Sequence, residues 1–193
     1  MRNYVTAILA TTLLMVACKP KEKEEPKKFI SVLSLIEKQV AHIDTSLYSI
    51  RKYVIHDSLH IDSSYVNREN FREVAKEFLE IPDLSDPKVA RRYKEETRYD
   101  PLTNWVIVSY VPVNPEKEDI QKQEIIVIPN AATGDKVNNI IIERLISNKN
   151  GYLSKKMYWQ TDKNFLITTT SQKPGEPEIV TITKVIWDEY SLQ

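Results

Sequence analysis

Apolar residues recur at helical spacing near the start of the chain. From Ile36 to Val54 the apolar positions follow one another at steps of three or four residues. This spacing places them on one face of a helix, and it predicts one long helix from Phe29 to about Val54. Such a helix is stable only when its apolar face packs on another element.

Two shorter helices are expected before the chain changes its pattern. Asn67 is a good N-cap, Pro82 ends the apolar stripe that follows, and a helix should lie between them. Pro87 suits the first position of the next helix, which is predicted over residues 88–96. The first part of the domain, residues 29–96, is therefore predicted to be helical.

The second part of the chain, residues 103–188, has the features of β-strands. Its apolar runs are rich in β-branched and aromatic residues, and turn residues separate most of them. Six consecutive strands with mostly short turns favour an antiparallel meander. With the helices packed on this sheet, residues 29–193 are predicted to be a single α+β domain. The expected strands are Asn104–Val113, Glu124–Ile128, Val137–Ser147, Ser154–Gln160, Asn164–Ser171 and Glu178–Trp187.

The last expected strand has two different faces. Val180, Ile182 and Ile186 share an apolar face, whereas Thr181 and Thr183 lie on the other. A curved sheet with the first helix packed in its concavity fits this pattern. That outline is similar to the periplasmic lipoprotein-carrier folds, in which a half-barrel plugged by a helix holds acyl chains. The similarity is one of outline, and it assigns no residue of this chain to a site.

The first 18 residues have the pattern of an export signal. Arg2 is followed by an apolar run from Tyr4 to Val16, which is too short to span a bilayer but suits the core of a signal peptide. Ala17 then stands directly before Cys18, with Met15 where leucine is more usual. This arrangement resembles the lipobox of bacterial lipoproteins. The resemblance implies cleavage before Cys18 and lipidation of that cysteine.

A lipidated Cys18 would anchor the chain firmly, because lipoproteins carry more than one acyl chain. Cys18 is the only cysteine, so a disulfide or cysteine-ligated zinc in the mature domain is then excluded. Residues 18–28 contain no aliphatic or aromatic residue, which predicts a disordered tether. This charged tether is similar to the surface-export segments of Bacteroidota lipoproteins. The alternative is a chance cysteine in an ordinary secretory signal.

Composition argues against several classes of function. Without residues 1–17 the chain loses one arginine of its 27 basic residues and keeps 27 acidic ones, which leaves a formal charge of −1. No basic excess therefore favours nucleic acid. The three glycines lie in turn-like contexts, and no phosphate-binding or nucleophile motif is present. We expect no cofactor and no enzymatic activity.

Two of the three histidines lie in the segment VIHDSLHID. On a helix, His56 and His60 would share a face and could bind one metal ion, with Asp57 or Asp62 as a third ligand. His42 would lie about 21 Å from them on a continuous helix and could not join. The alternative is a solvated helix end that enters a loop.

Aromatic residues gather in the predicted sheet. On one rim of the sheet they would form a platform for a glycan or a peptide, since tryptophan and tyrosine provide rigid amphipathic contact area. The alternative is that they fill the core or pair across strands. The candidates are Trp105, Tyr110, Tyr158, Trp159 and Trp187.

The sequence thus predicts a non-enzymatic lipoprotein of the cell envelope, held in the bilayer through acylated Cys18. An outer-membrane position facing the periplasm or the surface is expected. Three alternatives stay open for its domain. It could dock an envelope protein or glycan on its sheet, carry an apolar ligand in a cavity of roughly a few hundred Å³, or use His56 and His60 for metal binding or hydrolysis.

Overall fold

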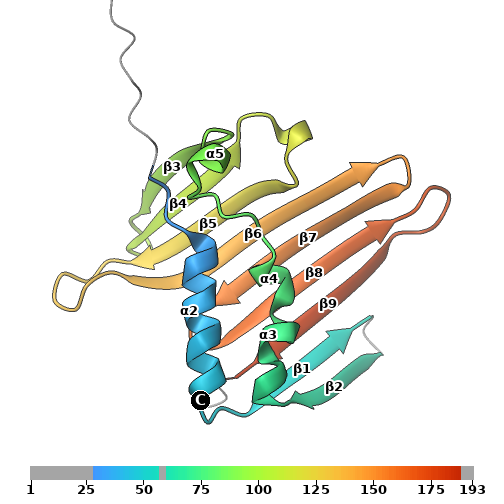
Figure 1. The fold of residues 1–193 in the computed structure, drawn as a ribbon, viewed down its shortest axis with the longest axis horizontal. Helices are drawn as coiled ribbons and strands as arrows, with labels where there is room; N and C mark the ends of the chain where they lie inside the picture. The colour runs from blue at the N-terminus through green and yellow to red at the C-terminus, as the bar shows by residue number, and fades with distance from the viewer. Residues whose placement is uncertain (1–27, 57–59, 188–193) are drawn as a thin grey trace, which may run out of the picture.

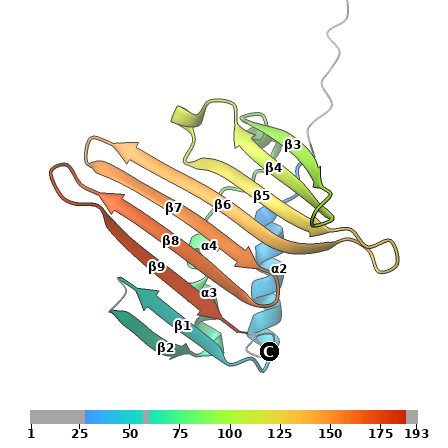
Figure 2. The same cartoon turned by 180° about the vertical axis from the view of Figure 1, so that it is seen from behind.

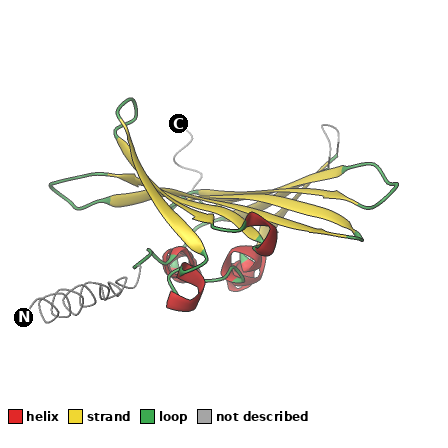
Figure 3. Cartoon of the chain, turned by 90° about the horizontal axis from the view of Figure 1, so that it is seen from above, coloured by secondary structure: helices red, strands yellow, loops and turns green. Residues whose placement is uncertain are grey.

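The described part of the chain forms one nine-stranded antiparallel sheet with helices on one face (Figures 1 and 3). The computed structural model describes residues 28–56 and 60–187. The strands are β1 (Ile50–Ile55), β2 (Ile61–Val66), β3 (Tyr93–Asp100), β4 (Trp105–Pro112), β5 (Ile120–Ile128), β6 (Lys136–Asn148), β7 (Gly151–Gln160), β8 (Asn164–Gln172) and β9 (Ile179–Ile186). The predicted α+β class and antiparallel sheet are confirmed.

The sheet has nine strands in its described part, and the prediction of six was wrong. The six expected strands correspond to β4 through β9, and the sheet order is β2-β1-β9-β8-β7-β6-β5-β4-β3. Strands β3 to β9 form the meander, to which β3 adds one strand at its start. The hairpin of β1 and β2 extends the sheet beside β9, so a segment expected to be partly helical lies beside the last strand of the meander.

The first helix, α2 (Val32–Thr45), begins three residues later and ends nine residues earlier than the predicted helix from Phe29 to about Val54. Ser31 caps it, because its hydroxyl accepts a hydrogen bond from the backbone N–H of Ser34 at 3.0 Å. At the other end, the Ser46 hydroxyl donates to the carbonyl of Ile43 at 2.8 Å. Such side-chain bonds compete with helix propagation. The buried face of α2 consists of Val32, Ile36, Val40 and Ile43.

Strand β1 occupies the segment in which the helix was expected to continue. Leu47 has the helical spacing, yet it is 96% exposed, so that spacing does not mark a buried face here. From Ile50 the chain is rich in β-branched and aromatic residues, which suit a strand. As a strand the segment gains two partners, β2 and β9.

The segment between β2 and β3 forms short helices rather than two regular ones. They are η1 (Arg68–Asn70), α3 (Phe71–Val74), α4 (Lys76–Leu79) and α5 (Pro87–Ala90). Phe71, Ala75 and Phe78 are fully buried although the helix is interrupted at Ala75. Pro87 opens α5 as predicted, but α5 stops at Ala90 and β3 replaces the rest of the expected helix. None of the helices in residues 28–56 and 60–187 is long and apolar enough to cross a membrane.

The core between the helices and the sheet centres on an aromatic cluster, made by Phe71, Phe78, Trp159, Phe165 and Trp187. Trp159 and Phe165 stack on neighbouring strands with ring centroids 5.3 Å apart. Phe78 meets Trp159 edge to face at 5.0 Å, and Phe71 meets Trp187 in the same way at 5.3 Å. These contacts fasten α3 and α4 to the sheet, since edge-to-face and offset-stacked pairs are the favoured aromatic geometries.

The start of the described chain is held on the same face by Tyr110. The Phe29 ring stacks on the Tyr110 ring at 4.4 Å, and the backbone N–H of Ile30 donates to the Tyr110 hydroxyl at 2.9 Å. Burial raises the pKa of Tyr110 to about 12, while the hydrogen bond from Ile30 acts in the opposite direction. The phenol is therefore protonated at neutral pH. The ring stacking and the hydrogen bond together fix the position at which the chain leads into α2.

Candidate functional site

The face of the sheet turned away from α2, α3 and α4 carries no helix in the described chain, and we call it the open face (Figures 2 and 3). Ser109, Glu124, Ile141, Tyr158 and Leu166 lie opposite one another on five neighbouring strands. Residues in register on antiparallel strands point to the same side. The row faces away from the core, because Trp159 and Phe165 alternate with its members and belong to the aromatic cluster.

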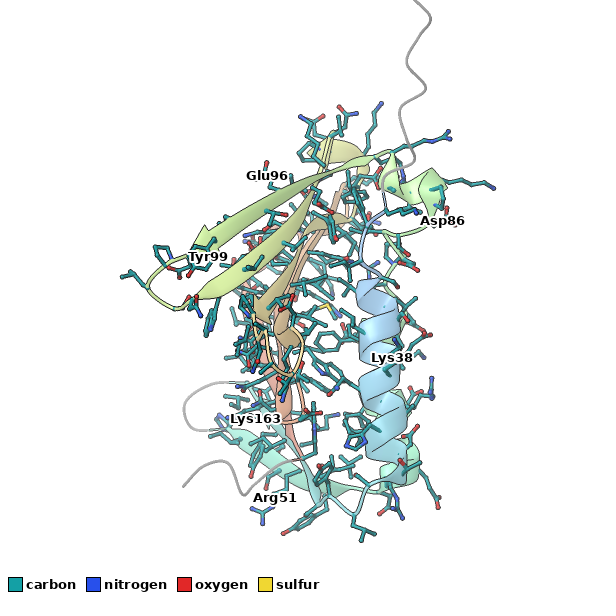
Figure 4. All side chains as sticks on the ribbon, turned by 90° about the vertical axis from the view of Figure 1, so that its left-hand side faces the viewer. Lys38, Arg51, Asp86, Glu96, Tyr99 and Lys163 are labelled. Carbon is teal, nitrogen blue, oxygen red and sulfur yellow. The ribbon has the colours of Figure 1, made fainter. Side chains whose placement is uncertain are left out.

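Part of the open face is buried although no helix covers it. Ser109 and Glu124 are each 7% exposed, and Asn139 is 5% exposed. Ile107 and Ile126 on the same strands are also buried and lie outside the core under the helices. Figure 4 shows the β3–β4 hairpin standing on the side of the sheet opposite α2. The twist of the sheet therefore brings neighbouring side chains around these residues.

Two small groups of polar contacts lie at this buried part. We call them together the polar centre; one contains Ser109, Lys122 and Glu124, and the other contains Asn139 and Tyr158. The Ser109 hydroxyl donates to Glu124 Oε1 at 3.0 Å, and Lys122 Nζ lies 2.9 Å from the same oxygen. On the other side, the Tyr158 hydroxyl donates to Asn139 Oδ1 at 2.8 Å. Burial raises the pKa of Tyr158, which keeps this donor protonated.

Glu124 and Asn139 project from neighbouring strands, because Asn139 lies two residues from Ile141, the direct partner of Glu124. A diagonal pair of this kind is about 7–8 Å apart at Cα. The polar side chains of β5 and β6 therefore lie close together on the open face.

The five aromatic candidates do not form one platform. Tyr110, Trp159 and Trp187 are at most 1% exposed and belong to the core on the helix side. For these three residues the platform prediction was wrong, because alternation along each strand points them away from the open face. Trp105 and Tyr158 lie on the open face and are half-buried. They remain candidates for contact with a partner.

The two paired histidines do not lie on a helix. His56 follows β1 and His60 precedes β2, and the N–H of His56 donates to the carbonyl of His60 at 3.1 Å. The helical spacing proposed for a metal site is therefore wrong. His56 Nε2 lies 3.8 Å from Asp62 Oδ2, and both side chains are more than half exposed. Asp57 lies outside the described residues, and the others hold no group of three or more His, Cys, Asp or Glu placed to bind a metal.

Sequence analysis missed Glu124 and Asn139. Each begins an otherwise apolar run, Glu124 before IIVI and Asn139 before III, so neither stands out from the ordinary polar residues of a strand. The sequence did hold one signal for them. Each lies within a strand whose side chains are covered by neighbouring strands, and a buried polar side chain needs a hydrogen-bond partner. Only the register between β5 and β6 shows that the two lie together.

The space between α2 and the sheet is mostly filled by side chains, since the inner face of the helix is at most 1% exposed. A depression of about 430 Å³ opens where α2 meets the β5–β6 and β7–β8 turns. Its lining includes Leu35 and Ile140 but also Gln39, Lys136 and Asp162. This lining is more polar than the Val, Ile and Leu surface expected of an apolar carrier.

Comparisons of the chain with known protein families, with curated proteins and with solved structures find no significant match. Cys18, the predicted lipidation site, lies outside the described residues.

Proposed function

We propose that this protein is a lipid-anchored, non-enzymatic lipoprotein of the cell envelope whose open face binds another envelope component. The observation that carries the binding part is the open face itself, where half-buried apolar and aromatic residues surround the polar centre. Exposed surface of this kind on a sheet is available for docking without rearrangement of the core. The carrier alternative has weaker support, because the inner face of α2 is packed against the sheet.

The anchoring part of the proposal is supported by the lipobox and by the length of the tether. Residues 18–28 are eleven residues, and the ten steps from Cys18 to Lys28 reach about 35 Å at most when fully extended. Phe29 is already stacked on Tyr110, so the domain begins directly after the tether. Acylated Cys18 would thus hold the domain close to the bilayer, on its periplasmic or its surface side.

Binding is proposed rather than catalysis because the polar centre lacks a histidine partner in the described chain. Four strands separate β1, which leads to His56, from β5, which carries Glu124. His42 lies on α2, across the sheet from the open face. A Ser–His–Asp arrangement therefore does not form around Ser109.

Replacement of Cys18 by alanine is expected to abolish lipid attachment. Cells grown with a clickable palmitate analogue should label the wild-type chain and not the Cys18→Ala chain, and only the wild type should stay with the membranes after an alkaline carbonate wash that removes peripherally bound protein. The control is Met15→Leu, which brings the segment closer to the usual lipobox and should be labelled at least as well. Equal labelling of the wild type and Cys18→Ala would refute the anchor.

A charged residue on the open face is expected to weaken binding to the envelope. The unlipidated Cys18→Ala protein should bind saturably to isolated envelopes from the producing cells. Adding Leu166→Arg, at the half-buried centre of the open face, should lower the affinity at least about tenfold, a loss of about 1.4 kcal/mol. The matched control, Glu37→Arg, lies on the exposed side of α2 and should bind normally. The open face would be excluded as the docking surface if the Cys18→Ala protein showed no saturable binding. It would also be excluded if Leu166→Arg and Glu37→Arg lost affinity equally.

A further inference from the structure

We infer that two copies of this chain associate through the free edge of β2 and join their sheets into one. Strand β2 lies at one end of the sheet, and no described element lies beyond it (Figures 1 and 2). Its side chains from Ile61 to Tyr65 are exposed. The inference goes beyond the proposed function, because it concerns the edge of the sheet and is independent of what the open face binds.

The backbone of β2 bonds to β1 at every second residue. The N–H of His56 donates to the carbonyl of His60 at 3.1 Å, and the register of the two strands continues from this bonded pair to Asp62 and Ser64. Asp62 and Ser64 therefore direct their N–H and C=O groups toward β1, since bonded pairs alternate along antiparallel strands. Three residues of β2 direct these groups away from β1, where the groups have no hydrogen-bond partner in the described part of the chain. They are Ile61, Ser63 and Tyr65.

The two edges of the sheet carry different charges. The exposed stretch of β3, Lys94–Tyr99, contains four charged residues. Charges along an edge strand discourage pairing with another chain. Strand β2 has one charged residue, Asp62, and it leaves Ile61 56% and Tyr65 72% exposed. Of the two edges, β2 is therefore the one that is open to a further strand.

A two-fold axis at Ser63 matches β2 to itself. In an antiparallel pair centred there, Ser63 lies opposite Ser63 of the second copy, and Ile61 lies opposite Tyr65 of the second copy. These are the residues whose backbone groups face outward, so each copy contributes three N–H and three C=O groups to the new ladder. Each exposed Ile61 covers an exposed Tyr65 ring, and Asp62 lies opposite the uncharged Ser64. Because the strand is complementary to itself, a second copy is the partner that fits it.

The same axis gives both copies the same orientation relative to the sheet. Ser63, Tyr53, Lys184 and Leu166 lie opposite one another on four neighbouring strands, so Ser63 is on the open face. Paired residues point to one side of a sheet, so the two open faces become continuous and both α2 helices lie on the other side. The two tethers that precede these helices then reach the same bilayer. The proposed anchor, which this step alone uses, agrees with a dimer of this symmetry.

The test is sedimentation equilibrium of the unlipidated Cys18→Ala protein. The interface is one strand pair with few side-chain contacts, so we expect a reversible equilibrium of monomer and dimer with a dissociation constant of roughly 10–100 µM. A protein that stays monomeric up to about 1 mM, or one that assembles beyond the dimer, would overturn the inference.

Two substitutions at the edge should each weaken the dimer at least about tenfold. Ser63→Pro removes one outward N–H and keeps the bonds to β1, because those belong to its two neighbours in sequence. Ile61→Lys places a charge in the new strand pair. The matched control is Ile179→Lys, since Ile179 is also 56% exposed but lies on β9, and this variant should dimerise normally. Thermal unfolding at low concentration shows that each variant keeps its fold.

A cysteine trap tests the register of the two strands. In the Cys18→Ala chain, Ser63→Cys introduces the single cysteine, and its two copies lie about 5.5 Å apart at Cα across the axis, within reach of a disulfide. The matched control is Ser64→Cys, whose two copies are diagonal neighbours about 7–8 Å apart and beyond that reach. Mild oxidation should therefore link the Ser63→Cys chains and leave most Ser64→Cys chains unlinked.

The variants decide where the two chains meet. If Ser63→Pro and Ile61→Lys dimerise as well as Ile179→Lys does, the interface lies elsewhere and the inference is overturned. Faster linking through Ser64→Cys would overturn the axis at Ser63. If the chain stays monomeric while envelope binding still depends on Leu166, the dimer alone fails and the proposed function stands.

Discussion

Truncation of Trp159 to alanine is expected to lower the free energy of unfolding by about 3–5 kcal/mol, the range for removal of a large aromatic side chain from a packed core. Trp159 is fully buried and touches four other rings of the aromatic cluster. Its loss would leave a cavity between α4 and the sheet. Because domains are stable by only about 5–15 kcal/mol, this one change removes a large share of the total.

The contribution of Trp159 is one of packing rather than hydrogen bonding. Its indole N–H is buried and has no hydrogen-bond partner among the described residues. Trp159→Phe should therefore cost less than half as much as Trp159→Ala, since it keeps most of the ring contacts and removes an unpaired donor that is costly to bury. An equal cost for both variants would show that the N–H, and not the ring, matters.

Urea unfolding, with the midpoint and the slope both measured, checks this prediction. The control is Trp105→Ala on the open face, where a half-buried tryptophan touches less of the protein and should lose well under half as much stability. A loss below about 1 kcal/mol for Trp159→Ala would contradict the close packing of α3 and α4 on the sheet.

The sequence predicted those strands whose local pattern is unambiguous and missed those that depend on distant partners. Strands β4 to β9 are rich in β-branched and aromatic residues and most are bounded by turn residues, so the local sequence is enough to predict them. Strand β1 cannot be predicted from its local sequence, because Ile50 and Val54 fit a helical period and a strand equally well. Pairing with β9, more than a hundred residues away, decides the outcome. Propensity yields to such tertiary contacts.

Strand β3 was missed for a different physical reason. It lies at the edge of the sheet with β4 as its one partner, and its residues from Lys94 to Tyr99 are exposed. An edge strand needs no apolar face, and charges along it discourage pairing with other chains. The sequence YKEETRYD therefore carries no apolar alternation that could have indicated a strand.

The candidate site was accessible from the sequence only in part. Trp105 and Tyr158 were named because their residue types suggest contact surfaces, but so were three aromatic residues that build the core. The side of the sheet on which a residue lies follows from strand parity and from the position of the helices. The position of the helices is a property of the whole fold, so the proximity of Glu124 and Asn139 on the open face could not be derived from local pattern.

Replacement of Gly151 by alanine is expected to destabilise the domain by about 3 kcal/mol or more. Gly151 opens β7 after the β6–β7 turn with φ of +126°, a conformation that side chains rarely adopt. A Cβ added there would lie 2.2 Å from the backbone carbonyl oxygen of Gln172 on β8. The strain of the backbone costs about 1–3 kcal/mol, and displacement of a paired strand adds a cost of similar size.

Gly175 provides the matched control for this prediction. It also has a positive φ, +78°, but a Cβ added there meets nothing within 4 Å. Gly175→Ala therefore pays the conformational cost alone, about 1–2 kcal/mol, and the difference between the two variants measures the contact with Gln172. Urea unfolding of both proteins gives that difference directly. Equal losses would mean that the start of β7 and the end of β8 separate at little cost. That result would contradict the close contact between Gly151 and Gln172.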